Sequence, residues 1–428
     1  PHLKNLDYVT QHCREVYRNY YHLHFPNDEN EWGRPLRTSP FYPRLKEAGA
    51  VFGEKNGWER VNYFDPGKSW RQAGYDQKNW GWGKPDFFDR VKKEALTARQ
   101  NVAVLDMTSF GKIEVTGKDA LDLLQMLAIS DVDRPLGSLT YTQFLNETAG
   151  IESDVTVCRI GQDHFRIISG TSFVSNDIGW IKMHAQVDKD VTIKDVTDEF
   201  ACLSLFGPNS RKVLEKITQA DVSNKAFAYM TAKKLDISNV NVWAQRVSYT
   251  GELGWELYMT NDDALKIWDV IMDAGQAFDI TPIGYKALDG LRIEKGFLYW
   301  SSDISPGDNP LEAGLGFCVD FSKDDFIGKD ALLKIKEAGL KTKLCGLTLD
   351  ADYCLFGGES VYKEGKIIDR IRSANHGYCA NTDIALIYLP LEMSKPGTEL
   401  EVEVMGKIVQ AKVASMPIVD PKGKRIRA

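Results

Sequence analysis

The sequence is poor in long apolar runs and in basic residues. Its 428 residues contain no stretch of ~18 consecutive apolar residues. Even the longest apolar runs are short, such as residues 201–207, so we predict no membrane-spanning helix. Lys and Arg total 53 against 60 Asp and Glu, a net charge of −7, which argues against a broad nucleic-acid-binding surface.

Cysteine and histidine are also scarce, at seven residues each. No two cysteines form a Cys-x-x-Cys pair, and the one close histidine pair, His22 and His24, has no third ligand nearby in the sequence. Dispersed cysteines are typical of reduced, buried thiols in a reducing compartment. We therefore predict neither a disulfide framework nor a metal site, and a location in the cytoplasm or, in a eukaryote, in the mitochondrial matrix.

Several catalytic signatures are missing as well. The sequence has no Gly-x-Gly-x-x-Gly after a strand-like run, no Gly-x-x-x-x-Gly-Lys-Ser/Thr loop and no Gly-x-Ser-x-Gly. These absences remove the main support for a simple dehydrogenase, a kinase or a serine hydrolase.

What is present is the composition of an ordinary globular protein, with 43% hydrophobic and 26% charged residues. The length allows two to four domains at ~100–200 residues each. Residues 1–6 contain neither an initiator Met nor the features of a signal or transit peptide, so we expect the chain to be part of a longer polypeptide or a processed one.

Three regions differ in character. Residues 1–95 begin with a helical pattern over 5–24 and continue with a segment rich in Trp, Tyr, Phe, Gly and Pro, which we interpret as a connector that packs on a neighbouring domain. Residues 96–342 interleave helices and strands without a regular βαβ period, which favours an α+β fold with antiparallel sheets. Residues 343–428 contain short strands separated by turns and predict a small terminal β-barrel. Helices are expected at 89–101, 118–127, 172–185, 208–216, 261–274, 284–294 and 331–338.

One candidate site lies where a turn leads into a strand. The run from Tyr141 to Val157 reads Tyr-Thr-Gln-Phe-Leu-Asn-Glu-Thr-Ala-Gly-Ile-Glu-Ser-Asp-Val-Thr-Val, with the turn ending at Gly150 and Asp154 near the start of the strand. A carboxylate there either serves the structure, by capping a turn or pairing with an Arg, or carries chemistry. The spacing alone favours the structural role.

A second run, from Ser248 to Leu257, reads Ser-Tyr-Thr-Gly-Glu-Leu-Gly-Trp-Glu-Leu. Its two glycines allow a sharp turn before a strand that carries Trp255 and Glu256 on opposite faces. Because the strand is apolar on either side, we expect Glu256 to be buried and to need donors, either from a ligand with two adjacent N–H groups or from an Arg.

A third run, from Ala287 to Gly296, predicts a helix with Gly296 as its C-terminal cap, and Pro-Leu-Glu-Ala-Gly-Leu-Gly follows at 310–316. Arg292 lies among apolar neighbours in this helix. It is either a structural ion-pair partner or an anion site.

In this order, the motifs resemble the folate-dependent aminomethyltransferase (T-protein) of the glycine cleavage system, and more closely the C-terminal half of the dimethylglycine and sarcosine dehydrogenases. The resemblance extends over nearly the whole chain. Residues 31–64, with Gly-Arg-Pro-Leu-Arg-Thr-Ser-Pro and Phe-Gly-Glu-Lys-Asn-Gly-Trp-Glu-Arg, look like the segment that joins the flavin half of those enzymes to the folate half. The resemblance implies that residues 1–95 are the tail of a flavin domain and the connector, 96–342 the folate-binding domain with a T-protein-like fold, and 343–428 the terminal barrel.

The resemblance also implies roles for residues. Asp154 would be the catalytic carboxylate, and Glu256 would take the pterin amino group and ring N–H, since paired N–H donors match one carboxylate. An ionised Asp would stabilise an electrophilic, cationic one-carbon group and accept a proton. The residues implied for the folate pocket are Tyr141, Thr156, Tyr249, Glu256 and Arg292. The family turn before the aspartate usually reads Gly-Gly and here reads Ala149-Gly150, so we expect any positive φ to fall on Gly150.

The function implied is the tetrahydrofolate-dependent half of an N-methyl amine demethylating dehydrogenase of the dimethylglycine or sarcosine type, which captures the iminium methylene as 5,10-methylenetetrahydrofolate. FAD is expected on an upstream or partner domain, together with most of the amine pocket, and neither nucleic acid nor membrane is expected as a partner. Two alternatives stay open. One is a non-catalytic regulatory or scaffolding relative, as the pyruvate dehydrogenase phosphatase regulatory subunit is; the other is a stand-alone folate-dependent methyltransferase.

Overall fold

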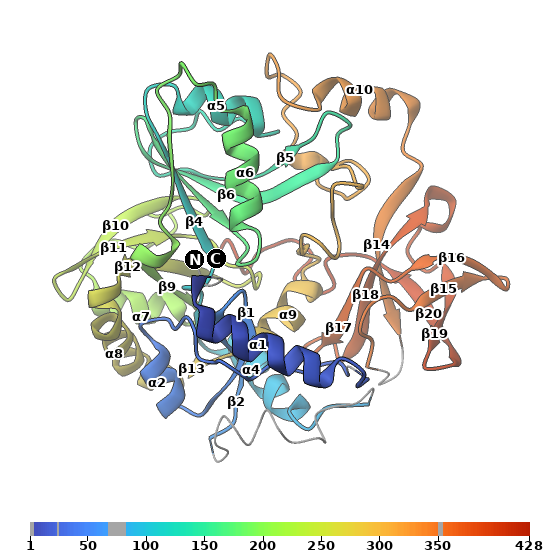
Figure 1. The fold of residues 1–428 in the computed structure, drawn as a ribbon, viewed down its shortest axis with the longest axis horizontal. Coiled ribbons are helices and arrows are strands. Elements are labelled where there is room, and N and C mark those ends of the chain that lie inside the picture. The colour runs from blue at the N-terminus through green and yellow to red at the C-terminus, as the bar shows by residue number, and fades with distance from the viewer. Residues whose placement is uncertain (1–3, 24, 67–82, 350–353) are drawn as a thin grey trace.

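Antiparallel sheets dominate the architecture (Figure 1). The structure, a computed structural model, describes residues 4–23, 25–66, 83–349 and 354–428. These residues form a two-stranded hairpin and sheets of five, six and seven strands. Neighbouring strands run antiparallel apart from one parallel pair, β13 (Thr281–Pro282) with β3 (Ala103–Asp106). This pairing, combined with helices on the sheets, confirms the predicted α+β class.

The six-stranded sheet has the order β10-β11-β12-β9-β3-β13 and is covered on both faces. Its other strands are β10 (Ala232–Ile237), β11 (Val240–Gln245), β12 (Gly254–Thr260) and β9 (Phe200–Phe206). Apolar residues of α7 (Ser210–Ile217) and α8 (Ala264–Gly275) pack on one face, around the fully buried Trp255. The opposite face packs on α4 (Phe88–Gln100) and α9 (Tyr285–Glu294).

The five-stranded sheet has the order β5-β6-β7-β4-β8 and lies at the top of Figure 1. Its strands are β5 (Leu139–Leu145), β6 (Ile151–Gly161), β7 (His164–Ser169), β4 (Gly111–Thr116) and β8 (Thr192–Asp195). The helices α5 (Ala120–Leu127) and α6 (Val174–His184) share one core with the residues of one face. From the other face, Ile168 packs into the same apolar cluster as Cys202 and Tyr258 of the six-stranded sheet. The two sheets therefore turn one face toward each other.

The C-terminal part forms the seven-stranded sheet, with the order β16-β15-β19-β20-β14-β18-β17 and a core of its own. It follows α10 (Lys329–Ala338). The strands are β14 (Thr342–Leu349), β15 (Ser360–Lys363), β16 (Lys366–Arg370), β17 (Ser373–Gly377), β18 (Thr382–Pro390), β19 (Glu399–Val404) and β20 (Lys407–Ala414). Sequence analysis missed β17, because its sequence Ser-Ala-Asn-His-Gly carries no apolar alternation.

The N-terminal part contains more regular structure than a connector. After α1 (Leu6–Asn19) come α2 (Tyr42–Glu47) and the hairpin of β1 (Ala50–Lys55) and β2 (Trp58–Phe64). The expected packing of the aromatic residues is confirmed: Phe41 and Phe52 join the core of the six-stranded sheet, with the Phe41 and Trp268 rings 5.8 Å apart. The aromatic run at 80–82 lies outside the described residues.

The helices expected between residues 89 and 338 agree with the structure to within three residues at each end. In the described part of the chain, short 3-10 helices lie at Thr197–Glu199, Asn261–Asp263, Gln276–Phe278, Gly316–Cys318 and Leu391–Met393. Within the described ranges, every helix is too short or too polar to cross a membrane. The seven cysteines all fall in these ranges, and none of them forms a disulfide.

Candidate functional site

Strands β5 and β6 present four polar residues on one face of the five-stranded sheet. In the antiparallel register Gln143 lies opposite Asp154, and Tyr141 lies opposite Thr156. Side chains of directly opposed residues share a face and lie ~4.5–5.5 Å apart at Cβ. Val155, between them in the sequence, points to the other face and into the core with α5 and α6. The structure thus brings three of the predicted site residues together and adds Gln143.

Asp154 is held by neutral hydrogen-bond donors. Gln143 Nε2 donates to Asp154 Oδ1 at 2.7 Å, and the Tyr141 hydroxyl donates to the same carboxylate. Burial raises the pKa of Asp154 to about 6 although both hydrogen bonds lower it, and the nearby charge of Asp177 raises it further. A structural carboxylate would pair with an Arg or cap a turn. Among the described residues, the groups that bind Asp154 are instead these two neutral donors. The carboxylate is therefore ionised near neutral pH without a countercharge.

The turn before Asp154 differs from the expectation. Ala149 has φ +69°, whereas Gly150 is absent from the positive-φ residues, so the prediction that the positive φ falls on Gly150 is wrong. Asn146 explains how Ala149 tolerates this conformation, because its side-chain oxygen accepts the Gly150 N–H at 2.8 Å and fixes the turn. Gly150 is needed for space instead: an added Cβ would lie 1.9 Å from the carbonyl oxygen of Pro306.

Glu256 lies on the facing sheet. As predicted, Trp255 and Glu256 point to opposite faces of β12, with Trp255 in the core beneath α7 and α8. The donor found for the buried Glu256 is the Tyr258 hydroxyl, 2.6 Å from Oε2. Burial raises the pKa of Glu256 to about 7, against that hydrogen bond and the charge of Lys112, which both lower it. No Arg is among the groups that act on this carboxylate within the described residues.

Lys112 connects the two sheets electrostatically. It lies on β4 opposite Ile168, whose side chain packs toward the six-stranded sheet. Its buried ammonium donates to three backbone carbonyls, those of Thr108 (2.8 Å), Phe110 (2.9 Å) and Thr197 (3.2 Å). Its charge acts on Glu256, and Ile168 beside it packs in one cluster with Tyr258, so the face that carries Asp154 and the face that carries Glu256 are turned toward each other.

Two glutamines on these faces have buried amide atoms without partners among the described residues. Gln143 Oε1, beside Asp154, and both amide atoms of Gln245 have no hydrogen-bond partner among the described residues. Gln245 lies directly opposite Glu256 in the β11–β12 register. Leaving a buried polar group unpaired costs ~1–3 kcal/mol, so unpaired amides beside two carboxylates indicate a polar ligand. Sequence analysis overlooked both glutamines; the strand register that sets them opposite the carboxylates was the available signal.

Tyr249 lies close to Asp154 and to Arg292. Its hydroxyl donates to the Leu298 carbonyl, and its ring stacks on Phe297 at 5.9 Å. Burial raises the pKa of Tyr249; the charge of Arg292 lowers it and that of Asp154 raises it. Tyr249 thus connects the surroundings of Asp154 with those of Arg292.

Arg292 is an ion-pair partner, which decides between the two alternatives left by the sequence. Its guanidinium contacts Asp289 at 2.6 Å and Asp303 at 2.7 Å, and it donates to Ser373 on β17 at 3.2 Å. The predicted cap at Gly296 (φ +64°) is confirmed, with Gly296 N–H donating to the Ile293 carbonyl at 2.9 Å. Arg292 thus joins α9 to the terminal sheet and borders the site through Tyr249.

Asp177 is a further buried carboxylate that sequence analysis missed. It lies in the first turn of α6 and accepts hydrogen bonds from Ser153 Oγ, at 2.6 Å, and from Ser169 Oγ. Ser153 precedes Asp154 and points to the opposite face of β6. Asp177 therefore fixes the strand at the residue next to Asp154, and its charge acts on that carboxyl.

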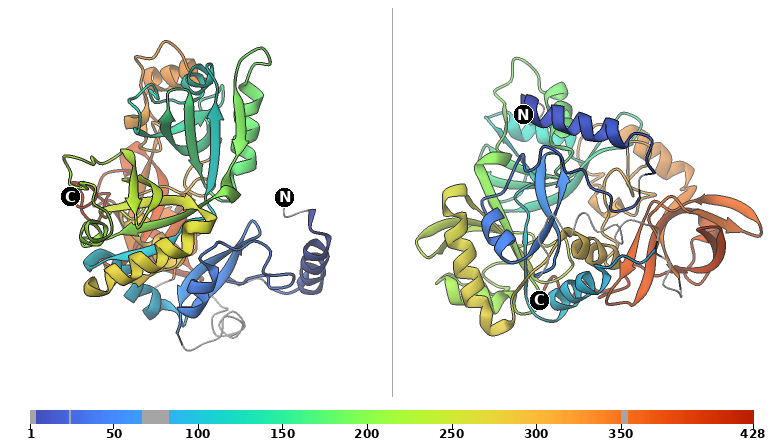
Figure 2. Two further views of the ribbon diagram at one scale, coloured as in Figure 1. Left: turned by 90° about the vertical axis from the view of Figure 1, so that its left-hand side faces the viewer. Right: turned by 60° about the horizontal axis from the view of Figure 1, so that its bottom comes forward.

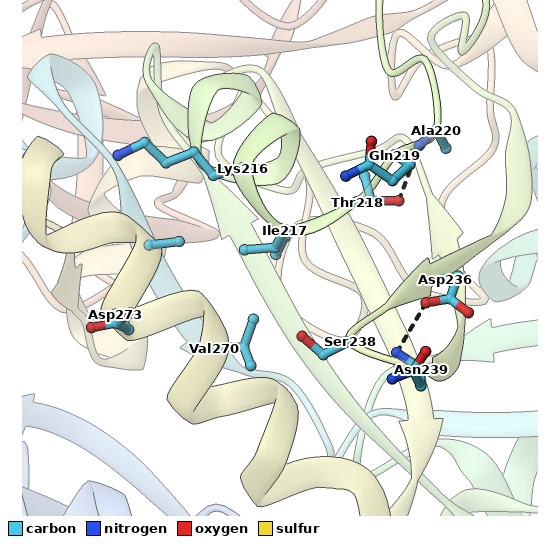
Figure 3. A pocket seen from close by; sticks show the side chains of 11 residues that line it. Lys216, Ile217, Thr218, Gln219, Ala220, Asp236, Ser238, Asn239, Val270 and Asp273 are labelled. Carbon is cyan, nitrogen blue, oxygen red and sulfur yellow. Dashed lines mark hydrogen bonds between the residues drawn. The ribbon is translucent and has the colours of Figure 1, made fainter.

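Surface depressions found elsewhere do not involve these residues. One of about 1100 Å³ is lined by side chains from α7, α8 and the β10–β11 turn, including Lys216, Asp236 and Asp273 (Figure 3). It lies on the α7–α8 side of the six-stranded sheet, opposite Glu256. The described part of the chain contains no cluster of three or more His, Cys, Asp or Glu residues suited to a metal ion.

Comparison with protein families gives three matches along the chain. Residues 41–323 match the GCVT N-terminal domain, and residues 342–420 match the glycine cleavage T-protein C-terminal barrel domain. Residues 1–39 match the FAD dependent oxidoreductase central domain. The second match agrees with the predicted terminal barrel.

Similar proteins include 4-methylaminobutanoate oxidase (formaldehyde-forming) from Paenarthrobacter nicotinovorans, which is 37% identical over 100% of this chain and 51% of its own length. Human mitochondrial dimethylglycine dehydrogenase is 36% identical over 98% of this chain and 48% of its own length. The chain thus spans about half the length of these relatives. The crystal structure of aminomethyltransferase T from Bartonella henselae has the same fold, with a TM-score of 0.76 at 24% identity, over 90% of this chain and 99% of that one.

Proposed function

Since this chain belongs to the glycine cleavage T-protein family, we propose that it is the tetrahydrofolate-binding half of an N-methyl amine demethylating dehydrogenase and that it forms 5,10-methylenetetrahydrofolate. The proposal includes the division of the chain into residues 1–95, 96–342 and 343–428, and the roles of the site residues given below. The observation that carries it is the set of buried amide atoms without partners, Gln143 Oε1 and both amide atoms of Gln245, beside the carboxylates of Asp154 and Glu256.

The residues present fit a pterin. Glu256 would accept the paired N–H donors of the pterin ring, because a carboxylate offers two oxygens with about four lone-pair sites. Gln245, opposite Glu256, would offer the pterin one acceptor and one donor, and both of its buried amide atoms would then have hydrogen-bond partners. Tyr249 and Tyr141 would form aromatic walls, Thr156 a polar contact, and Arg292 the border of the pocket.

Asp154 would act at the reacting centre. Tetrahydrofolate, when bound, supplies the nucleophilic nitrogens that take up a one-carbon unit. With its pKa near 6 and no countercharge, Asp154 is ionised at pH 7, stabilises a nearby cation and can accept the proton that the attacking nitrogen loses. Gln143 and Tyr141 hold the carboxylate in one orientation for this transfer.

The relatives support the oxidative half of the proposal. Dimethylglycine dehydrogenase and 4-methylaminobutanoate oxidase both resemble the chain over its full length, and residues 1–39 match a domain of FAD-dependent oxidoreductases. We therefore place FAD and the amine pocket on the half of the enzyme that lies outside this chain. The segment 1–39 would belong to that half.

The test uses the enzyme that contains this chain together with its FAD-binding half, with Asp154→Asn as the variant. Asn keeps the shape and the acceptor for Gln143 but not the charge. We expect the rate of amine oxidation, monitored as reduction of the flavin, to be unchanged. Formation of 5,10-methylenetetrahydrofolate should slow about 10²- to 10⁴-fold, and formaldehyde should be released instead.

The matched control is Asp188→Asn, at an exposed position between α6 and β8. It should leave both rates unchanged. Unaltered methylene transfer in Asp154→Asn would remove Asp154 from the mechanism.

A further inference from the structure

The first helix buries polar contacts and exposes an apolar face. On α1, Tyr8 and Glu15 are the buried residues. The Glu15 carboxylate accepts the backbone N–H groups of Glu31 and Trp32, each at 2.9 Å, and so holds α1 on the loop that follows it. Residues seven apart lie on one side of a helix, so Tyr8 and Glu15 define the side that faces the body of the protein.

The exposed apolar residues lie on the other sides of α1 and just beyond its end. Tyr17 is 85% exposed and Tyr21, just beyond the helix, is 93% exposed. The aromatic face, as we name this surface, consists of Leu6, Val16, Tyr17, Tyr20, Tyr21 and Leu23 together with the exposed thiol of Cys13. A surface helix normally turns its apolar stripe to the core. Among the described residues, α1 is held on the loop that contains Glu31 and Trp32, and its exposed apolar residues point away from that loop.

Such a face is typical of an interface. Exposed apolar patches on soluble proteins mark interaction sites, and Tyr is enriched among the residues that carry binding energy. In Figure 2, α1 stands at the edge of the molecule, beyond the β1–β2 hairpin, and no other element covers its outer side.

We propose that the aromatic face of α1 docks on the FAD-binding half of the enzyme. The inference rests on the proposed function and adds the surface of this chain that the rest of the FAD-binding half covers. Two observations select this occupant: residues 1–39, which include α1, match the FAD dependent oxidoreductase central domain, and the relatives are about twice as long as this chain.

Cys13 provides the probe, because its exposed thiol lies within the aromatic face. A maleimide should label Cys13 at least about tenfold more slowly in the complete enzyme, joined to its FAD-binding half, than in the 428-residue chain alone. The double variant Tyr17→Gln/Tyr21→Gln should restore most of the labelling rate in the complete enzyme. The matched control is Met183→Cys on α6, a position 73% exposed, which should react equally in both forms.

Equal labelling of Cys13 in both forms would overturn the proposal. So would protection of Cys13 in the chain alone that rises with concentration and accompanies a dimer in sedimentation, since a second copy would then be the occupant. Tetrahydrofolate binding is measured on the same preparations. Its absence would refute the proposed function while Cys13 protection still reported on docking, so the two failures are distinguishable.

Discussion

The substitution Glu256→Gln separates a ligand-binding carboxylate from a structural one. Glu256 is buried on β12, with Tyr258 donating to Oε2 at 2.6 Å. Gln keeps the size and one carbonyl acceptor but presents an NH₂ group where the pterin would present a second donor. A hydrogen bond to a charged group contributes ~1.5–3 kcal/mol, so the dissociation constant for tetrahydrofolate should rise about 10- to 150-fold.

The pH dependence sharpens this prediction. Because burial raises the pKa of Glu256 to about 7, the carboxyl is mostly protonated at pH 6 in the free chain. N–H donors favour the ionised form, so binding lowers this pKa and releases a proton, about half a proton per site at pH 7. The dissociation constant of the unmodified chain should therefore fall about fivefold from pH 6 to pH 7 and about tenfold from pH 6 to pH 8, and level off above pH 8.

The assay is calorimetric titration with tetrahydrofolate between pH 6 and 8.5, in buffers of different ionisation enthalpy to count protons. Glu256→Gln should bind weakly at every pH and release no proton. Glu215→Gln, at an exposed position on α7, is the control and should behave like the unmodified chain. Equal affinity in Glu256→Gln, or an unchanged proton release, would refute the reasoning.

Three further substitutions test the surroundings of the site. Asp177→Asn removes the negative charge that raises the pKa of Asp154, so the acidic limb of the pH profile of methylene transfer, near pH 6, should move to lower pH; an unchanged or higher midpoint would contradict this. Arg292→Met leaves the fully buried Asp303 without its guanidinium and should destabilise the protein by about 3–5 kcal/mol, seen as a lower urea midpoint. Gly150→Ala must displace the Pro306 carbonyl and should cost at least ~1–3 kcal/mol in thermal unfolding, whereas Gly179→Ala in α6, where an added Cβ meets nothing within 4 Å, should not destabilise; equal melting temperatures would show that the Pro306 loop yields freely.

Helices and strands could be predicted where the spacing of apolar residues within one segment determines them. Helices α4 to α9 follow from apolar spacing, and the placement of Trp255 and Glu256 on opposite faces follows from the two-residue period of a strand. The hairpin of β1 and β2 was not predicted, because its aromatic and glycine residues are equally typical of an irregular connector that packs on a neighbouring domain. Its burial depends on the sheet beneath it, which lies far away in the sequence.

Some residues of the candidate site were predicted from the sequence, but their arrangement was not. The family resemblance supplied Asp154 and Glu256, yet only the strand registers place Gln143 and Gln245 beside them. The contacts of Arg292 with Asp303 and Ser373 depend on how the chain after α9 folds back, which spacing cannot give. The positive φ of Ala149 is set by the Asn146 side chain and the close Pro306 carbonyl, both tertiary effects.

The central claim is that this chain has a pterin-binding site, and one titration tests it most directly. The unmodified 428-residue chain is titrated at pH 8 with tetrahydrofolate and, separately, with p-aminobenzoylglutamate, which lacks the pterin ring. We predict saturable binding of one tetrahydrofolate per chain and none of p-aminobenzoylglutamate over the same range. Absence of tetrahydrofolate binding at high micromolar concentration would contradict the account and favour a non-catalytic member of the family.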